Sequence, residues 1–316
     1  MPELPEVETV RRIVTGHLVG RTLVSLDLTL PKLLRDSPIP TLEPLIGRTV
    51  LAARRRAKVL TIDFSADLSL LIHFKLAGQL AVIPPSGERA YAGHPVPKPE
   101  GDYPHKTTHL TLRFDDGTVA YYSDIRQFGW LRLMPTEDVE GVVADFGFGP
   151  EGTLGEPLDA DALAARFGRR TIPIKATLLD QTIIAGLGNI YVDEALFAAN
   201  VHPATLSNEV TPDRIEELTR TIPWALDRGI EQGGAKIIHN KAYPIDGFPQ
   251  VHARQGEPCP VCGTPIVKTR VGGRGTYYCP HCQPDPEGWV RPPATGSKVG
   301  KKAEAALAER EELDAD

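Results

Sequence analysis

Four cysteines form the most specific chemical motif of the sequence. Two residues separate Cys259 from Cys262, two separate Cys279 from Cys282, and sixteen lie between the pairs. Four thiolates at this spacing can surround one zinc ion tetrahedrally, with a β-hairpin between the two CxxC turns. A redox dithiol needs only one such pair, so we expect one structural Zn2+. Because the protein fills all four ligand positions, this metal has no open position for catalysis.

The tip of the expected hairpin carries a single charge among glycines. It reads VGGRG, with Arg274 as its cation. A guanidinium can bind a phosphate through two parallel hydrogen bonds, and small neighbours permit close approach. The alternative interpretation is an ordinary solvent-exposed turn.

The start of the chain is the second candidate for chemistry. Pro2 follows Met1, and a small second residue normally permits removal of the methionine, which would expose a secondary α-amine. Such amines titrate near ~8, so a neutral, nucleophilic fraction exists at physiological pH. Attack on a carbonyl-like carbon would give an iminium ion, an electron sink for elimination, and the neighbouring Glu3 could transfer protons. Proline and glutamate also open helices well, so the alternative is a structural role.

Composition permits large hydrophobic cores but does not itself indicate a nucleic-acid partner. The 316 residues are 41% hydrophobic with a net charge of −6, which suits two domains plus a small module. No apolar run approaches the ~20 residues that span a bilayer. The acidic start is unlike a signal peptide, so a cytoplasmic protein without a membrane partner is expected. Basic residues nevertheless cluster at 54–58, 169–170 and 254–274. Each cluster can be interpreted either as a set of phosphate contacts or as solvated surface.

Hydrophobic periodicity assigns different structures to successive segments. Residues 4–18 have helical spacing, and 22–134 alternate as strands, with a hairpin turning at DDG, residues 115–117. These strands predict a β-sandwich. Glycine, proline and acids then indicate a linker. Helical spacing returns over 158–232, with helices expected at 174–181, 190–200 and 212–233.

Three motifs resemble, in order, those of the formamidopyrimidine-DNA glycosylase family. They are PELPEVETV at 2–10, LLDQTIIAGLGNIYVDEALFAANVHP at 178–203, and the zinc module ending in GTYYCPHC at 282. The start is closer to the branch acting on oxidised purines, because its endonuclease VIII relatives usually have glycine at the position of Leu4. The resemblance implies an α+β multidomain fold. Its expected parts are an N-terminal β-sandwich with flanking helices (1–134), a linker (135–157), a helix–two-turn–helix DNA-binding domain (158–250), a zinc-finger β-hairpin (251–282) and a disordered tail with a short helix (283–316).

The resemblance also implies an activity. It is that of a base-excision-repair DNA glycosylase and abasic-site lyase, a bacterial-type monomer acting on damaged double-stranded DNA. Pro2 would attack the anomeric carbon of the damaged nucleotide, with Glu3 as general acid. Lys58 matches the lysine that donates a proton in β-elimination, and Arg274 matches the zinc-finger arginine linked to phosphate binding and δ-elimination.

Further positions match DNA contacts of the family. A glycosylase must extrude its target base and fill the void. The void-filling pair corresponds to an arginine and a phenylalanine of SDIRQFGW, which taken alone would be an ordinary strand arginine and a core phenylalanine. A leucine replaces the usual methionine of the third filler, and threonine replaces one of two usual histidines at position 107. The implied DNA-binding residues are Leu76, His109, Arg126, Phe128, Arg170 and Asn189.

One segment departs from the family pattern. The stretch between Gly234 and Gly256, where relatives have a loop that caps 8-oxoguanine, is shorter and not recognisable. We therefore keep two alternatives: an abasic-site lyase or oxidised-pyrimidine glycosylase with little 8-oxoguanine activity, and a DNA-damage-binding zinc protein without catalysis. The set of Pro2, Glu3, Lys58 and Arg274 argues against the second, because a pure binder needs no proline amine.

Overall fold

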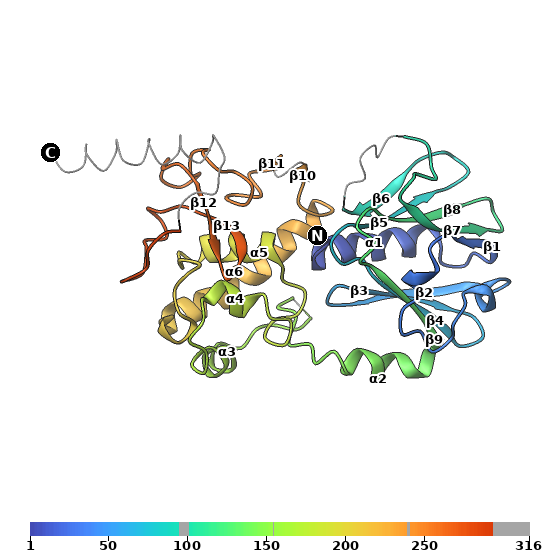
Figure 1. Ribbon diagram of the computed structural model, residues 1–316, viewed down its shortest axis with the longest axis horizontal. Helices are drawn as coiled ribbons and strands as arrows, with labels where there is room; N and C mark the ends of the chain where they lie inside the picture. Colours follow the sequence, from blue (N-terminus) through green and yellow to red (C-terminus); the bar gives the residue numbers. More distant parts are fainter. Residues whose placement is uncertain (95–100, 154, 239–240, 293–316) are drawn as a thin grey trace. The chain divides into compact units, whose positions relative to one another are not determined.

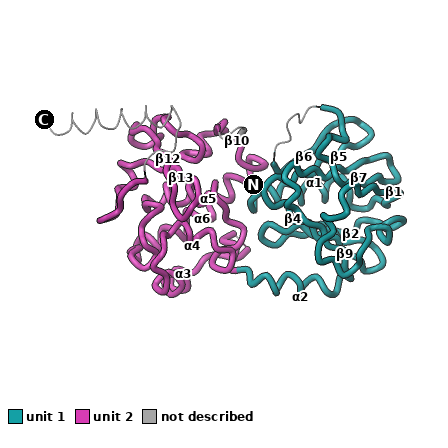
Figure 2. The backbone as a smooth tube through the Cα atoms, in the orientation of Figure 1, with its two compact units in different colours: residues 1–148 teal, residues 149–316 magenta. Residues whose placement is uncertain are grey.

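The computed structural model describes residues 1–94, 101–153, 155–238 and 241–292. The chain divides into two compact units, Met1–Phe148 and Gly149–Asp316 (Figure 2). The tail expected to be disordered lies outside the described residues from position 293 onward. In the described part, no helix combines the length and the apolar character needed to cross a membrane.

Unit 1 opens with helix α1 (Leu4–His17), close to the predicted 4–18. Glu3 precedes it as N-cap, and its N–H donates to Glu6 Oε2 at 2.8 Å, as in a capping box. The apolar residues at helical spacing, among them Val7, Val10 and Val14, are fully buried in the core of the unit.

The predicted β-sandwich is confirmed as two antiparallel sheets that share this core (Figure 1). The five-stranded sheet has the order β1 (Leu23–Leu28), β7 (Thr108–Phe114), β8 (Val119–Asp124), β5 (Gly78–Ile83), β6 (Ala90–Gly93). The four-stranded sheet has the order β2 (Val50–Arg56), β3 (Val59–Phe64), β4 (Leu68–His73), β9 (Trp130–Pro135). Helix α1 packs against β5 and β6 of one sheet and β2 and β3 of the other, so it flanks the sandwich and anchors the N-terminus to both layers.

Part of the segment expected to be a linker is helical. The 3-10 turn η3 (Thr136–Asp138) leads into α2 (Val139–Ala144). Val139 joins Trp130 and Met134 in a second small apolar cluster on the four-stranded sheet. Sequence periodicity misses this helix because its apolar stripe is too short to stand out among the surrounding acids and glycines.

Unit 2 contains the predicted helical segments. The helices predicted at 174–181 and 190–200 end earlier, at Leu178 and Ala198. Its helices are α3 (Ala160–Phe167), α4 (Ile174–Leu178), α5 (Asn189–Ala198) and α6 (Pro212–Glu231). Gly229 of α6 permits close packing on α5, because a Cβ there would lie 2.4 Å from the ring of Tyr191.

Two small hairpins complete unit 2. They are β10–β11 (Ile237–Ile238 and Lys241–Ala242) and β12–β13 (Val267–Val271 and Arg274–Tyr278). The second has a two-residue turn in which Gly272 and Gly273 have φ of +56° and +76°. Positive φ at both positions is the type I′ geometry that suits the twist of a hairpin and requires glycine-like residues.

Candidate active site and zinc finger

The first residues after Met1 are buried. Pro2 is buried, and Glu3 is only 1% exposed. Burial lowers the pKa of His94, and the positive charge of the N-terminal ammonium lowers it further. His94 directly follows β6, and its N–H donates to Gly78 O at 2.9 Å.

Lys58 lies on the turn between β2 and β3 and is 7% exposed. Burial, and after it the charges of Lys75 and Lys58, lower the pKa of His73 to about 3, so His73 is neutral at physiological pH. Arg55 donates to Ala57 O in the same turn at 3.0 Å. The turn that carries Lys58 is therefore held in place by the side chain of Arg55, which belongs to β2.

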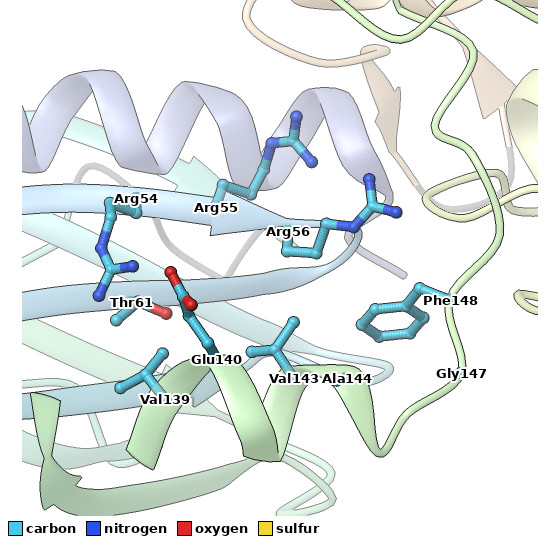
Figure 3. A pocket seen from close by; sticks show the side chains of 10 residues that line it. All are labelled: Arg54, Arg55, Arg56, Thr61, Val139, Glu140, Val143, Ala144, Gly147 and Phe148. Carbon is cyan, nitrogen blue, oxygen red and sulfur yellow. The ribbon is translucent and has the colours of Figure 1, made fainter. Parts of the chain in front are cut away.

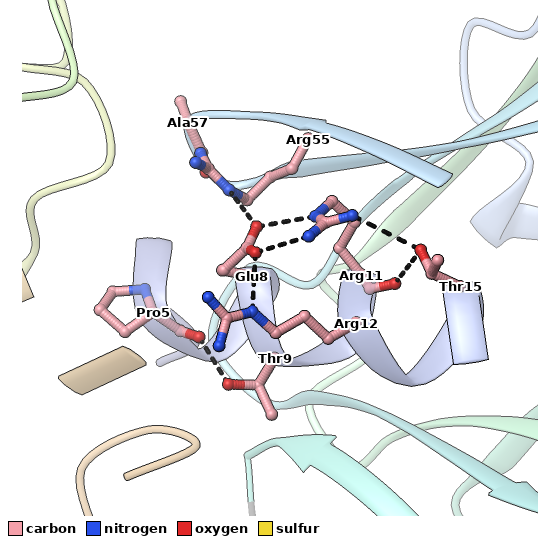
Figure 4. A network of polar contacts seen from close by, with 8 residues as sticks. All are labelled: Pro5, Glu8, Thr9, Arg11, Arg12, Thr15, Arg55 and Ala57. Atoms are coloured by element: carbon pink, nitrogen blue, oxygen red, sulfur yellow. Dashed lines mark hydrogen bonds and ion pairs between the residues drawn. The ribbon is translucent and has the colours of Figure 1, made fainter. Parts of the chain in front are cut away.

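Glu8 ties helix α1 to this turn (Figure 4). Its carboxylate accepts hydrogen bonds from Arg11 at 2.8 and 2.9 Å and from Arg12 at 3.0 Å, and it contacts Arg55 at 3.4 Å. Burial raises the pKa of Glu8, but the hydrogen bonds and charges of these arginines outweigh it and lower the pKa to about 2. The network thus connects the helix that begins just after Pro2 to the turn that carries Lys58.

The depressed pKa of Glu8 predicts a pH-dependent contribution to stability. The contribution is present above the ordinary pKa of 4.5 and is lost as pH falls toward the folded value of about 2. We expect Glu8→Gln to lower the free energy of unfolding by about 1–2 kcal/mol at pH 7, allowing for solvent screening, and by less at pH 3.5. Urea titration at both pH values measures this. The exposed Glu137→Gln is the control, and an equal deficit at both pH values would contradict the assignment.

The loop between β8 and β9 presents Arg126 and Phe128 to solvent. Phe128 is 48% exposed, which excludes a core role, and the Arg126 guanidinium lies 5.6 Å from its ring centroid. Asp124 folds the loop, because its buried carboxylate accepts the N–H groups of Arg126 at 3.0 Å and Gly129 at 2.8 Å. His109 is 8% exposed and its Nε2 lies 3.1 Å from Asp124 O, so it supports the loop from behind.

Leu76 lies beside this loop. It is half-buried in the connection from β4 to β5, which crosses between the two sheets as the β8–β9 loop does. The sheet register pairs Gly78 with Asp124 and His73 with Trp130. The two connections therefore leave both sheets at neighbouring positions, which brings the three expected void-filling residues to one end of the sandwich.

A surface pocket of about 550 Å³ lies beside the arginine run of β2 (Figure 3). Arg54, Arg55 and Arg56 line it together with Glu140. Arg54 is already engaged by Asp63 through two hydrogen bonds of 2.7 and 2.8 Å. Three arginines face one carboxylate in this lining, so the pocket is a basic surface on which Arg54 is already paired.

In unit 2, the side chain of Asn189 binds the backbone of the residue that follows Arg274. Asn189 opens α5 after Gly188, and its Nδ2 donates to the carbonyl oxygen of Gly275 at 2.9 Å. Arg274 begins β13 with an exposed side chain. Arg170 is half-buried and forms an ion pair with Asp180 at 2.9 Å.

The four cysteines fit a tetrahedral metal. Their Sγ atoms all lie within 4.8 Å of one another, with Cys259 3.8 Å from Cys282 and Cys262 3.5 Å from Cys279. A disulfide would need about 2.05 Å, whereas zinc bonded to sulfur at ~2.3 Å gives sulfur–sulfur edges of about 3.8 Å. The thiolate set suits one structural Zn2+, as the spacing predicts.

Comparisons with known proteins match three successive parts of the chain. The N-terminal domain of formamidopyrimidine-DNA glycosylase matches residues 1–131, and the H2TH domain of that enzyme matches 148–240. A zinc finger found in Fpg and IleRS matches 256–284. The chain belongs to the formamidopyrimidine-DNA glycosylase family.

Relatives match nearly the whole length of this family member. It is 38% identical to the formamidopyrimidine-DNA glycosylase of Pelotomaculum thermopropionicum, over 90% of this chain and 99% of the relative. It is 40% identical to that of Chloroflexus aurantiacus, over 90% and 98%. Among solved structures, Lactococcus lactis Fpg bound to DNA containing an abasic site has a TM-score of 0.78 at 33% identity, covering 90% of this chain and 100% of that one. Its complex with DNA containing Fapy-dG has a TM-score of 0.77, with the same identity and coverage.

Sequence reasoning missed two residues of the candidate site. Asp124 shapes the loop of Arg126 and Phe128, and its position two residues before Arg126 is a signal for a side-chain-to-backbone turn. His94 lies near the N-terminus only because β6 packs on α1, and no local pattern indicates that contact.

Proposed function

We propose that this bifunctional DNA glycosylase and abasic-site lyase of base excision repair acts through a Schiff base on Pro2. The supporting observation is the N-terminus itself. Pro2 is buried directly before the capped start of α1, and Glu3 is adjacent. Removal of Met1 would make the Pro2 nitrogen the nucleophile.

The chemistry follows from a secondary amine. Its lone pair attacks C1′ of the damaged nucleotide, the bond from C1′ to the base breaks, and the electron pair leaves with the base. The base takes up the proton that the Pro2 nitrogen loses, so the nitrogen regains a lone pair. Glu3 gives a proton to the ring oxygen as the sugar opens, which leaves a cationic C1′=N iminium. Loss of the C2′ proton then expels the 3′ oxygen, and loss of the C4′ proton expels the 5′ oxygen. In this scheme Lys58 donates a proton during β-elimination and Arg274 binds phosphate for δ-elimination.

The DNA contacts follow the same proposal. Phe128 and Leu76 would wedge into the stack and Arg126 would face the orphaned base, consistent with two exposed side chains and one half-buried one at the same end of the sandwich. Asn189 would bind phosphate at the N-terminus of α5. His109 would act through the loop it supports, and Arg170 through a guanidinium shared with Asp180. The enzyme would act as an intracellular monomer on damaged double-stranded DNA.

Borohydride trapping on an abasic-site duplex tests the reaction. Reduction of the iminium would fix a covalent adduct between the protein and DNA, and peptide mass spectrometry should place it on Pro2 with Met1 removed. Absence of any adduct would contradict the Schiff-base mechanism and favour a damage-binding protein without catalysis.

The short stretch after α6 bears on lesion preference. Arg228 donates to Asp246 O at 3.1 Å, and Phe248 is buried against Tyr191 and Trp224. This part of the stretch is thus fastened to the helical domain, which leaves less chain for capping an extruded base. The observation favours a second candidate function, removal of formamidopyrimidines or cleavage at abasic sites with little 8-oxoguanine activity.

A panel of duplexes measures that preference. We expect single-turnover cleavage of formamidopyrimidine and abasic-site duplexes to exceed that of 8-oxoguanine by about tenfold, the effect of one or two missing hydrogen bonds to the base. A 5-hydroxycytosine duplex completes the panel. Equal rates on 8-oxoguanine and formamidopyrimidine would contradict the inference from the short stretch.

A further inference from the structure

The outer edge of β13 is held by side chains in place of a third strand. Its register pairs Val271 with Arg274 and Arg270 with Gly275 across the hairpin. In a hairpin closed by a two-residue turn, the polar backbone groups of alternate residues point away from the partner strand. Gly275 and Tyr277 have this outward orientation and would need other hydrogen-bond partners.

Helices α4 and α5 supply those partners. Gly275 O accepts from Lys175 Nζ at 3.0 Å and from Asn189 Nδ2 at 2.9 Å. Tyr277 N donates to Asp193 Oδ2 at 3.2 Å. The turn also lies against α4, because a Cβ on Gly272 would be 3.2 Å from the Cβ of Ala176. The backbone on both sides of Arg274 is therefore fixed to the helical domain.

Asp193 is the centre of this arrangement. It is fully buried, as is Lys175, whose Nζ lies 2.6 Å from Asp193 Oδ1. The other oxygen binds His252 Nδ1 at 2.7 Å as well as Tyr277 N. A buried ion pair is costly unless its remaining hydrogen-bonding positions are filled, and here both carboxylate oxygens are used. The carboxylate thus joins α4, β13 and the segment around residue 252.

We propose that Asp193 is a positioning residue for the reaction, which holds the hairpin backbone so that the Arg274 side chain reaches the phosphate of the δ-elimination step. The inference rests on the proposed function, because it assigns Arg274 to that step. Asp193 is too deeply buried to touch DNA itself and acts through Lys175, Gly275 and Tyr277. The same backbone segment also connects the two expected phosphate-binding residues, because Gly275, which follows Arg274, accepts a hydrogen bond from Asn189.

Product ratio separates this role from a general need for folding. On an abasic-site duplex, β-elimination leaves an unsaturated aldehyde at the 3′ end and δ-elimination leaves a 3′ phosphate. We expect Asp193→Asn to lower the ratio of δ to β product by about tenfold, a loss typical of a displacement below 1 Å. An amide has one acceptor oxygen and a donor in place of the second, so it cannot serve Lys175, His252 and Tyr277 together.

Controls make the result decisive. Reactions are normalised to active enzyme by borohydride trapping, with zinc content measured for each variant, and Asp161→Asn on the exposed face of α3 is the matched control. Arg274→Ala should give the same loss of ratio, and adding Asp193→Asn to it should change the ratio no further. A parallel fall of both products with an unchanged ratio would overturn the proposal.

A second variant covers the case in which Asp193→Asn does not fold. Lys175→Met combined with Asp193→Leu replaces the buried pair with apolar groups, which proteins commonly tolerate. It removes the ties from Lys175 to Gly275 and from Asp193 to Tyr277, and leaves the hydrogen bond from Asn189 to Gly275. The ratio should therefore fall as in the single variant, and a wild-type ratio would overturn the inference. Failure of the wild type to form any trapped adduct would instead contradict the proposed function.

Discussion

Replacing Pro2 with glycine should reduce borohydride-trapped adduct on an abasic-site duplex by at least ~100-fold at equal time and protein concentration. A secondary amine condenses directly to a cationic iminium, whereas glycine offers a primary amine without the proline ring that fixes its direction. Misplacement of a reacting atom by about 1 Å is enough for a loss of this size. Gel separation of the trapped complex measures the change.

Pro5 provides the matched control for this experiment. It is also a buried proline of the first turn of α1, so Pro5→Ala tests the effect of disturbing the start of the helix without touching the terminal amine. We expect Pro5→Ala to retain trapping within a few-fold of wild type once corrected for folded protein. Equal losses in both variants would mean that Pro2 serves the helix, and an undiminished adduct in Pro2→Gly would exclude Pro2 as nucleophile.

Glu3 should behave differently from Pro2 in the same assays. Its side chain is almost wholly buried, and only the glycosylase step needs it to protonate the sugar oxygen. Glu3→Gln should therefore impair cleavage of duplexes with a damaged base more than trapping at a preformed abasic site. That difference separates general-acid catalysis from the capping contribution of residue 3, which both substrates require equally.

Local patterns in the sequence predict those parts of the site whose residues are neighbours along the chain. The periodicity of residues 4–18, the turn at 115–117 and the two CxxC pairs each encode their own geometry, and the structure has α1, the β7–β8 hairpin and the cysteine cluster there. Helices 174–181 and 190–200 are also found, although α4 ends at Leu178. The chain leaves α4 in local turns, since Asp180 N donates to Thr177 O and Thr182 N donates to Asp180 Oδ1. A pattern of apolar spacing does not record the residue at which such turns begin.

Contacts between distant segments could not be predicted in this way. Asp193 looks like one more polar residue on a helix until β13 and the segment at 252 are placed against it, because 84 residues separate it from Tyr277. The coupling of His94 to the N-terminus likewise depends on the packing of β6 on α1. Phe128 shows the converse, since an aromatic residue beside a strand suggests a core position, and only the Asp124 turn exposes it.

Loss of zinc should abolish the contribution of the finger while leaving the sandwich folded. We expect Cys279→Ser to lower bound zinc from one equivalent to well below half. Strand-cleavage activity on an abasic-site duplex should fall by at least ~100-fold, because a structural zinc site supplies on the order of 10 kcal/mol of folding free energy to a small module. The apolar cluster of the finger is small and is shared with Phe197 of α5, and Cys259 and Cys279 themselves take part in it. Without the metal, the two cysteine pairs that flank the β12–β13 hairpin of Arg274 are no longer joined.

His281 is the matched control for this prediction, because it lies between two cysteine ligands yet is exposed and outside the cysteine cluster. His281→Ala should keep one equivalent of zinc and near-wild-type cleavage. A loss of zinc in His281→Ala would show that a histidine replaces one of the four cysteines as a ligand. Full cleavage by zinc-free Cys279→Ser would mean that the metal is dispensable for holding Arg274.

Because Lys175, Asn189 and Asp193 also bind β13, zinc removal combined with Asp193→Asn should lower the δ-to-β ratio further than either change alone, as expected of two supports on one strand.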